Sequence, residues 1–193
     1  MKPTTRFFLR IALVTGSFFG IGMAVLILLM FSFFLPIDSI IGYALVLGLL
    51  GGLLFGLFFS AIITYMQVSA LKKMGETDLT EDMLSVVQKK LIRTPQTLDD
   101  LITKLENTEK FNRINIITPN KKIGVKGGLS WASWGEKVEI TLTGKEGELN
   151  VFELMSRPSV KTTMADYGKN RKNVQELERI LLGGNDLSEH LIG

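Results

Sequence analysis

The stretch IIGYALVLGLLGGLLFGLFFSAIITYM, residues 40–66, carries the clearest helix-packing signal of this chain. It holds no charged residue, and a small residue recurs at every fourth position: Ala44, Gly48, Gly52, Gly56 and Ser60. Residues four apart share one side of a helix, and small side chains there let a second backbone come close, which is how helices associate in lipid. The spacing therefore predicts a glycine-zipper-like face on a membrane helix.

The preceding stretch, IALVTGSFFGIGMAVLILLMFSFFLPI, residues 11–37, carries a matching face. Its small residues have the same spacing: Ala12, Gly16, Gly20 and Ala24. The basic start before it resembles that of a signal peptide, but the apolar run is too long and no A-x-A-like cleavage site follows, so we expect a retained helix. Because about 20 apolar residues cross a bilayer, the sequence predicts two spans, about 11–35 and 40–66.

A turn at residues 36–39 makes the two spans antiparallel neighbours. The residue numbers of two facing residues should then add up to about 76. This register brings four pairs together: Ala24 with Gly52, Gly20 with Gly56, Gly16 with Ser60, and Ala12 with Thr64. The glycines can simply close one hairpin, or they can join copies into an oligomer, because Ala44, Gly48 and Gly51 are left unused. A pore is a third interpretation, although neither span holds an ionisable residue of the kind that marks ion pathways.

Basic residues flank the two spans on one side only. Lys2, Arg6 and Arg10 precede the first span and Lys72 and Lys73 follow the second, whereas the connecting loop has none. The positive-inside rule then places both termini in the cytoplasm. We therefore expect a multi-pass protein of the bacterial cell (inner) membrane, with the lipid bilayer as its first partner.

The composition excludes several classes of function. Three of the 22 basic residues and one of the 19 acidic residues precede residue 72. Residues 72–193 therefore hold 19 basic and 18 acidic residues and are nearly neutral. With no recognisable nucleic-acid-binding motif either, we expect no nucleic-acid partner. The chain has no cysteine, and its single histidine, His190, lies in the tail. We expect no enzyme here, with no catalytic residue, no metal site and no cofactor.

Residues 72–110 are expected to form a helical linker and helices. A helix near Thr80 to Arg93 has acidic residues in its first turn, basic residues in its last turn, and an apolar stripe. That stripe consists of Met83, Leu84, Val87 and Leu91. Pro95 stops this helix, and Thr97 with Asp100 resembles a capping box that starts a second amphipathic helix.

Residues 111–193 are expected to form an antiparallel sheet plus a C-terminal helix. Alternating apolar residues predict strands in residues 112–118, 122–126, around 130–134, 137–143 and 148–154, with a turn at 144–147. The terminal helix, residues 170–182, ends at Gly183 and Gly184. The sequence therefore predicts an α+β membrane protein: an antiparallel two-helix transmembrane hairpin followed by a small cytoplasmic domain in which helices pack on an antiparallel sheet.

Two groups of basic residues are candidates for binding an anion or lipid. The first surrounds the start of the terminal helix, where free N–H groups attract anions: Arg157, Lys161, Lys169, Arg171 and Lys172. The alternative is that Asn170 caps the helix, Gly168 supplies a positive φ, and the basic side chains are solvated. The second group can lie on anionic headgroups or guard a sheet edge: Lys121, Lys122 and Lys126.

The C-terminal third also carries a resemblance. Ser-Arg-Pro at 156–158 and Asp-Tyr-Gly-Lys-Asn-Arg-Lys-Asn at 166–173 lead into the terminal helix, and Gly-Glu-Lys at 135–137 precedes them. This pattern resembles one found in small uncharacterised domains of bacterial membrane-associated proteins. The resemblance implies the α+β fold and a bacterial membrane location, and it carries no activity or catalytic residue.

These features favour a non-enzymatic integral membrane protein that presents a cytoplasmic α+β module. The module is expected to bind a partner protein, an anionic lipid headgroup or another anionic ligand. The alternative is a homo-oligomeric channel or transport subunit assembled through the glycine-zipper faces.

Overall fold

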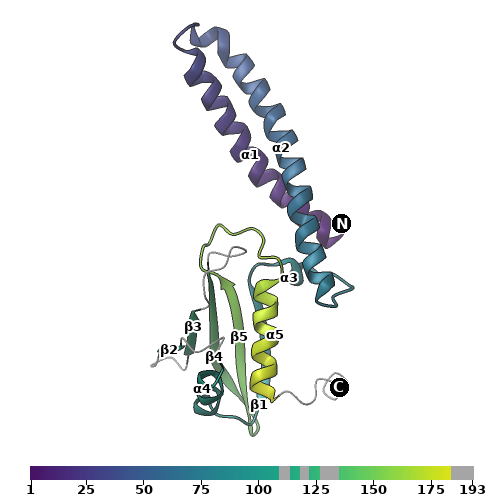
Figure 1. Ribbon diagram of the computed structural model, residues 1–193, viewed down its shortest axis with the longest axis vertical. Coiled ribbons are helices and arrows are strands. Elements are labelled where there is room, and N and C mark those ends of the chain that lie inside the picture. Colours follow the sequence, from purple (N-terminus) through teal and green to yellow (C-terminus); the bar gives the residue numbers. More distant parts are fainter. Residues whose placement is uncertain (109–113, 118–121, 127–134, 184–193) are drawn as a thin grey trace. The chain divides into compact units, whose positions relative to one another are not determined.

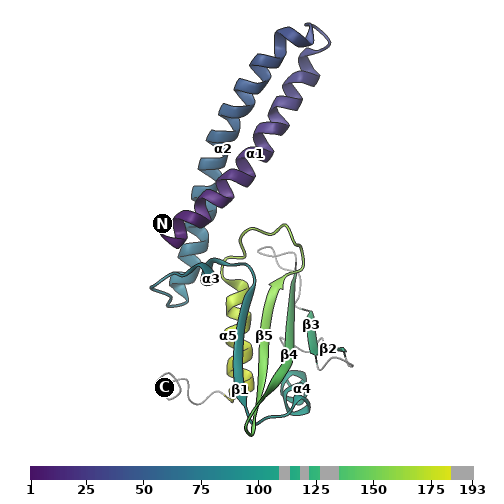
Figure 2. The same ribbon diagram turned by 180° about the vertical axis from the view of Figure 1, so that it is seen from behind.

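The computed structural model describes residues 1–108, 114–117, 122–126 and 135–183 (Figures 1 and 2). The chain divides into two compact units, Met1–Leu84 and Ser85–Gly193. The first unit consists of helices, and the second contains an antiparallel sheet with helices, so the layout is α+β.

Two long helices make up most of the first unit. They are α1 (Pro3–Phe31) and α2 (Ile37–Lys73), which lie side by side and antiparallel (Figure 1). Both are long and apolar enough to cross a membrane. The short helix α3 (Glu81–Leu84) packs against α1, where Glu81 forms an ion pair with Arg6.

The small faces of α1 and α2 meet, as the four-residue spacing predicts, but in a different register. A Cβ atom at Gly52 would lie 2.5 Å from the carbonyl oxygen of Gly16, and one at Gly20 would lie 2.7 Å from that of Gly48. The residue numbers of facing residues therefore add up to about 68–72 and not to the predicted 76. This difference shifts one helix along the other by about one to two helical turns. The expected pairing of Gly20 with Gly56 is wrong because the turn lies at residues 32–36, before the expected position.

The second unit is built on a five-stranded antiparallel sheet with the order β1-β5-β4-β3-β2. The strands are β1 (Gln88–Thr94), β2 (Ile114–Ile117), β3 (Lys122–Lys126), β4 (Glu136–Glu146) and β5 (Leu149–Pro158). The β4–β5 turn consists of residues 147 and 148 and not of the expected 144–147, because Gly144 continues the strand past an irregularity after Leu142. The strand expected around 130–134 lies outside the described residues.

Helices α4 (Leu98–Glu106) and α5 (Lys169–Leu182) pack against the same face of this sheet. Alternate residues of β4 and β5, such as Ile140 and Leu154, form one core with leucines from both helices. Figure 1 shows α5 running along the sheet beside β5. The opposite face carries charged residues, as the period-two alternation predicts.

The capping box that starts α4 is confirmed. The Thr97 side chain accepts a hydrogen bond from the Asp100 N–H, while the Asp100 carboxylate accepts from the Thr97 N–H at 2.8 Å and from its hydroxyl at 2.7 Å. These two hydrogen bonds hold the pKa of Asp100 below its usual value. The stabilisation is therefore present above the ordinary pKa of an aspartate and is lost as the pH falls through the lowered one.

The helix expected from Thr80 to Arg93 is wrong beyond Leu84. Residues 88–94 instead form β1, the edge strand that pairs with β5 along its whole length, from Gln88 opposite Ser156 to Thr94 opposite Asn150. Leu91, expected in the apolar stripe, is 55% exposed. Pairing explains the difference, because without β1 this edge of β5 would present a row of unpaired backbone groups, and tertiary context overrides a short helical period.

We predict that Gly52→Ala disrupts the hairpin, because its added Cβ meets backbone atoms of α1 that cannot rotate away. The chain has no cysteine, so spin labels introduced at the exposed positions 18 and 54 can report the distance between α1 and α2 in lipid. We expect a longer and broader distance distribution in the variant.

Gly22→Ala is the matched control, because a Cβ there meets nothing within 4 Å. Alanine favours a helix over glycine by about 1 kcal/mol, so this variant should keep the native distance. An unchanged distance in Gly52→Ala would show that the close backbone approach is not required.

Candidate functional site

The first candidate site surrounds the start of α5, and its centre is the carboxylate of Asp166. This carboxylate accepts hydrogen bonds from the N–H of Asn170 at 2.8 Å and from the N–H of Gly168 at 3.2 Å. Tyr167 and Gly168 adopt left-handed φ values of 53° and 73°, which direct the backbone around the carboxylate. Asp166 is only 1% exposed. The N–H groups that the sequence offered to an external anion therefore bind the chain's own carboxylate.

Asn170 is not the capping side chain that one interpretation of the sequence expected. Its side chain accepts a hydrogen bond from the Ser156 hydroxyl at 2.6 Å and donates one to the carbonyl of Val86 at 2.9 Å. Asn173 also donates to the Ser156 hydroxyl. These buried polar groups connect α5 with β5 and with the residues before β1. The positive φ expected at Gly168 is confirmed.

Acidic residues on the sheet neutralise part of the predicted basic group. Lys169 pairs with Glu136 at 2.6 Å, and Glu136 is itself only 4% exposed. Arg157 pairs with Glu139 at 2.8 Å, and Lys122 lies 4.0 Å from the same carboxylate. The sequence contained one signal for the burial of Glu136, which occupies the same period-two phase as Val138 and Ile140.

The remaining predicted cations differ in their surroundings. Arg171 is half-buried and interacts with another group of the chain, so it is not free, whereas Lys161 and Lys172 are exposed. Lys137, which the sequence analysis did not single out, is exposed on β4 beside Arg157. Lys121 and the side chain of Lys126 lie outside the described residues.

We define the basic end of the sheet domain by six residues that surround the start of β4, the end of β5 and the start of α5. They are Lys137, Arg157, Lys161, Lys169, Arg171 and Lys172. The acidic residues described in the same region are Glu136, Glu139 and Asp166, and all three are buried or half-buried and bound to other groups of the chain. The charge that this end presents to solvent is therefore positive.

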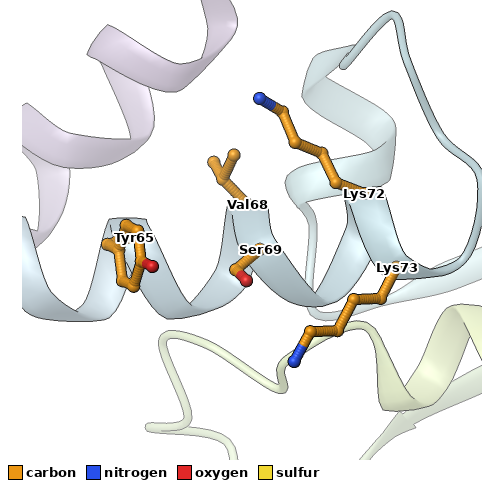
Figure 3. A pocket seen from close by; sticks show the side chains of 5 residues that line it. All are labelled: Tyr65, Val68, Ser69, Lys72 and Lys73. Carbon is orange, nitrogen blue, oxygen red and sulfur yellow. The ribbon is translucent and has the colours of Figure 1, made fainter.

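A second candidate site lies on the last turns of α2. A pocket of about 380 Å³ is lined by Tyr65, Val68, Ser69, Lys72 and Lys73. Figure 3 shows Tyr65 and Ser69 on the near face of the helix, with Lys72 and Lys73 leaving it toward opposite sides. From the sequence, the two lysines were expected only to orient the helix in a membrane, and no local pattern indicated a pocket.

A third feature is an apolar groove of about 500 Å³ between α1 and α2. Its floor consists of small residues of both helices: Ala12, Gly16, Gly20, Ala24, Gly48 and Gly52. Its walls consist mainly of leucines, including Leu13 on α1 and Leu49 and Leu53 on α2. Ala44, Gly56 and Ser60 of the predicted face are also buried in the hairpin.

Comparisons with known proteins found no matching family model, no matching curated protein and no matching solved structure. The resemblance of the C-terminal third to bacterial membrane-associated domains therefore stays a prediction. Within the described ranges, no three metal-ligating side chains gather into a cluster.

We predict that Asp166→Ala destabilises the sheet domain by about 1–3 kcal/mol, because it removes a helix cap and leaves buried N–H groups without an acceptor. Hydrogen exchange should accelerate at the amides of Gly168 and Asn170. Glu148→Gln, which removes a charge from the exposed β4–β5 turn, should leave the exchange unchanged. Equal exchange in Asp166→Ala and the native protein would contradict the assigned cap.

Proposed function

We propose that this chain is a non-enzymatic integral membrane protein whose hairpin anchors a cytoplasmic α+β module, and that the basic end of the module binds anionic lipid headgroups. The proposed location is the bacterial inner membrane, with two spans and both termini in the cytoplasm. Support comes from the two apolar helices and from the basic residues that flank them only on the side of the termini.

The single observation that supports the lipid-binding proposal is that acidic side chains of the basic end are bound inside the domain, whereas several of its basic side chains are exposed. Its acidic groups bind other groups of the same domain: Asp166 caps α5 and Glu136 pairs with Lys169. Lys137, Lys161 and Lys172 remain exposed. Each basic residue at an anionic leaflet contributes about 1 kcal/mol, so three of them provide a useful attraction.

The short connection between the hairpin and the module strengthens this attraction. Only residues 85–87 connect α3 to β1, so the module stays near the membrane that holds the hairpin. A short linker of this kind gives a high effective concentration of headgroups, and individually weak contacts then suffice. The short linker therefore favours a lipid surface over a soluble anionic ligand, whose local concentration it does not raise.

The alternative, a homo-oligomeric channel or transport subunit, has less support. Its assembly was expected through the glycine faces, yet Gly16, Gly20, Gly48, Gly52 and Gly56 approach one another within a single hairpin. These glycines already pack against the other helix of the same chain. The alternative therefore needs another contact surface.

We predict that the basic end is protected from hydrogen exchange by anionic lipid. In nanodiscs that contain phosphatidylglycerol, residues 157–172 should exchange more slowly than in nanodiscs of phosphatidylcholine alone. The double variant Lys161→Gln/Lys172→Gln should strongly reduce the difference, and so should high salt, because screening weakens surface charge interactions.

Lys145→Gln/Arg179→Gln is the matched control. It removes the same charge from exposed positions outside the basic end, and it should keep the lipid-dependent protection. Identical exchange of residues 157–172 in the two lipid compositions would contradict the proposed lipid binding.

A further inference from the structure

Neither the pocket on α2 nor the groove between α1 and α2 has a role in the proposal above. We infer that together they bind one anionic phospholipid, with its phosphate at Tyr65, Ser69, Lys72 and Lys73 and an acyl chain directed into the groove. This inference rests on the proposed membrane insertion, but it does not depend on lipid binding by the basic end.

The chemistry of the pocket suits a phosphate group. The hydroxyls of Tyr65 and Ser69 can donate hydrogen bonds, and the ammonium groups of Lys72 and Lys73 supply charge from either side (Figure 3). In the described part of the chain, neither ammonium group pairs with a carboxylate. This distinguishes them from Arg6, whose charge is paired with Glu81.

The pocket and the groove lie on one continuous ridge of α2. The groove wall on this helix is formed by Leu45, Leu49, Leu53 and Leu57, each four residues after the last. The same spacing continues through Ala61 to Tyr65, Ser69 and Lys73, which line or flank the pocket. Residues four apart form a ridge along a helix surface. A molecule that lies along this ridge therefore meets polar groups at one end and leucines at the other.

The two sides of the hairpin differ in what packs over the small residues. On one side, Phe19 stacks on Phe55 with ring centroids 4.3 Å apart, and Phe55 stacks on Phe59 at 5.4 Å. Met23 covers Gly51 on that side as well. Aromatic rings and Met23 pack on that side, whereas the leucine-walled side has a hollow of about 500 Å³.

The dimensions fit a lipid of the leaflet on the cytoplasmic side. An acyl chain spans half of the hydrocarbon core, about 15 Å. With a rise of 1.5 Å per residue, this length covers about ten residues of α2. A chain that begins at the level of Tyr65 therefore ends near Phe55, between the wall residues Leu57 and Leu53. The charge at the polar end favours a phospholipid with a net negative headgroup.

Native mass spectrometry of the full chain, released from membranes that contain phosphatidylglycerol and phosphatidylcholine, tests this inference. We expect a monomer that retains one phospholipid, with a preference for phosphatidylglycerol. Lys72→Gln/Lys73→Gln should weaken that preference about thirty-fold, because each basic residue at an anionic headgroup contributes about fivefold. Lys2, Arg6 and Arg10 remain in this variant to maintain the orientation.

Ser17→Phe tests the groove without changing a charge, because Ser17 lies in the groove lining. It should reduce retention of both lipids while the preference for the anionic one persists. Lys161→Gln/Lys172→Gln should leave lipid retention unchanged, which separates this inference from the function proposed for the basic end. Release as a lipid-free monomer, or as a lipid-free dimer whose second copy occupies the groove, would overturn the inference.

Discussion

The close approach of two helix backbones at Gly16 and Gly52, and again at Gly20 and Gly48, is the constraint on which the rest of the first unit depends. In each pair, the position where a Cβ would stand lies within 2.7 Å of the facing carbonyl oxygen, in both directions. Each glycine therefore directs a Cα–H group at the opposite carbonyl, a weak hydrogen bond that recurs at helix interfaces. With the hairpin inserted in a membrane as proposed, lipid supplies no hydrophobic drive between its helices, and such contacts and packing must then hold the hairpin together.

This use of the glycines affects every functional interpretation. It engages the small faces inside one chain, so an oligomer cannot form through the same contacts between glycines. It also creates the groove, because a floor of glycine and alanine between rows of leucine leaves space on the side that Phe19 and Phe55 do not fill. In the sheet domain, the binding of acidic side chains within the domain has a comparable effect. Asp166 accepts a hydrogen bond from the start of α5, and Glu136 pairs with Lys169. The exposed lysines then give a nearly neutral domain one positive end.

Sequence periodicity predicted the elements whose signals are local. The facing small residues, the capping box at Thr97 and the closing Gly183 all follow from spacing over a few positions. The hairpin register was missed because it depends on where α1 ends, and nothing in the apolar run marks Phe31. β1 was missed because its strand state comes from pairing with β5, more than fifty residues later. At the candidate site, Asn170 was expected to cap α5, but its side chain instead bonds to Ser156 and Val86, which only the fold brings close, and the carboxylate of Asp166 binds the N–H groups at the helix start.

Solid-state NMR on glycine-labelled protein in lipid can show whether the glycine faces of α1 and α2 meet within one chain. Labelled chains show contacts between the glycines of α1 and α2, and dilution with an excess of unlabelled protein removes any contact that joins two chains. We expect the contacts of Gly16 with Gly52 and of Gly20 with Gly48 to persist at full strength per labelled chain. Their disappearance on dilution would show that the glycine faces meet between chains, and it would contradict the closed hairpin.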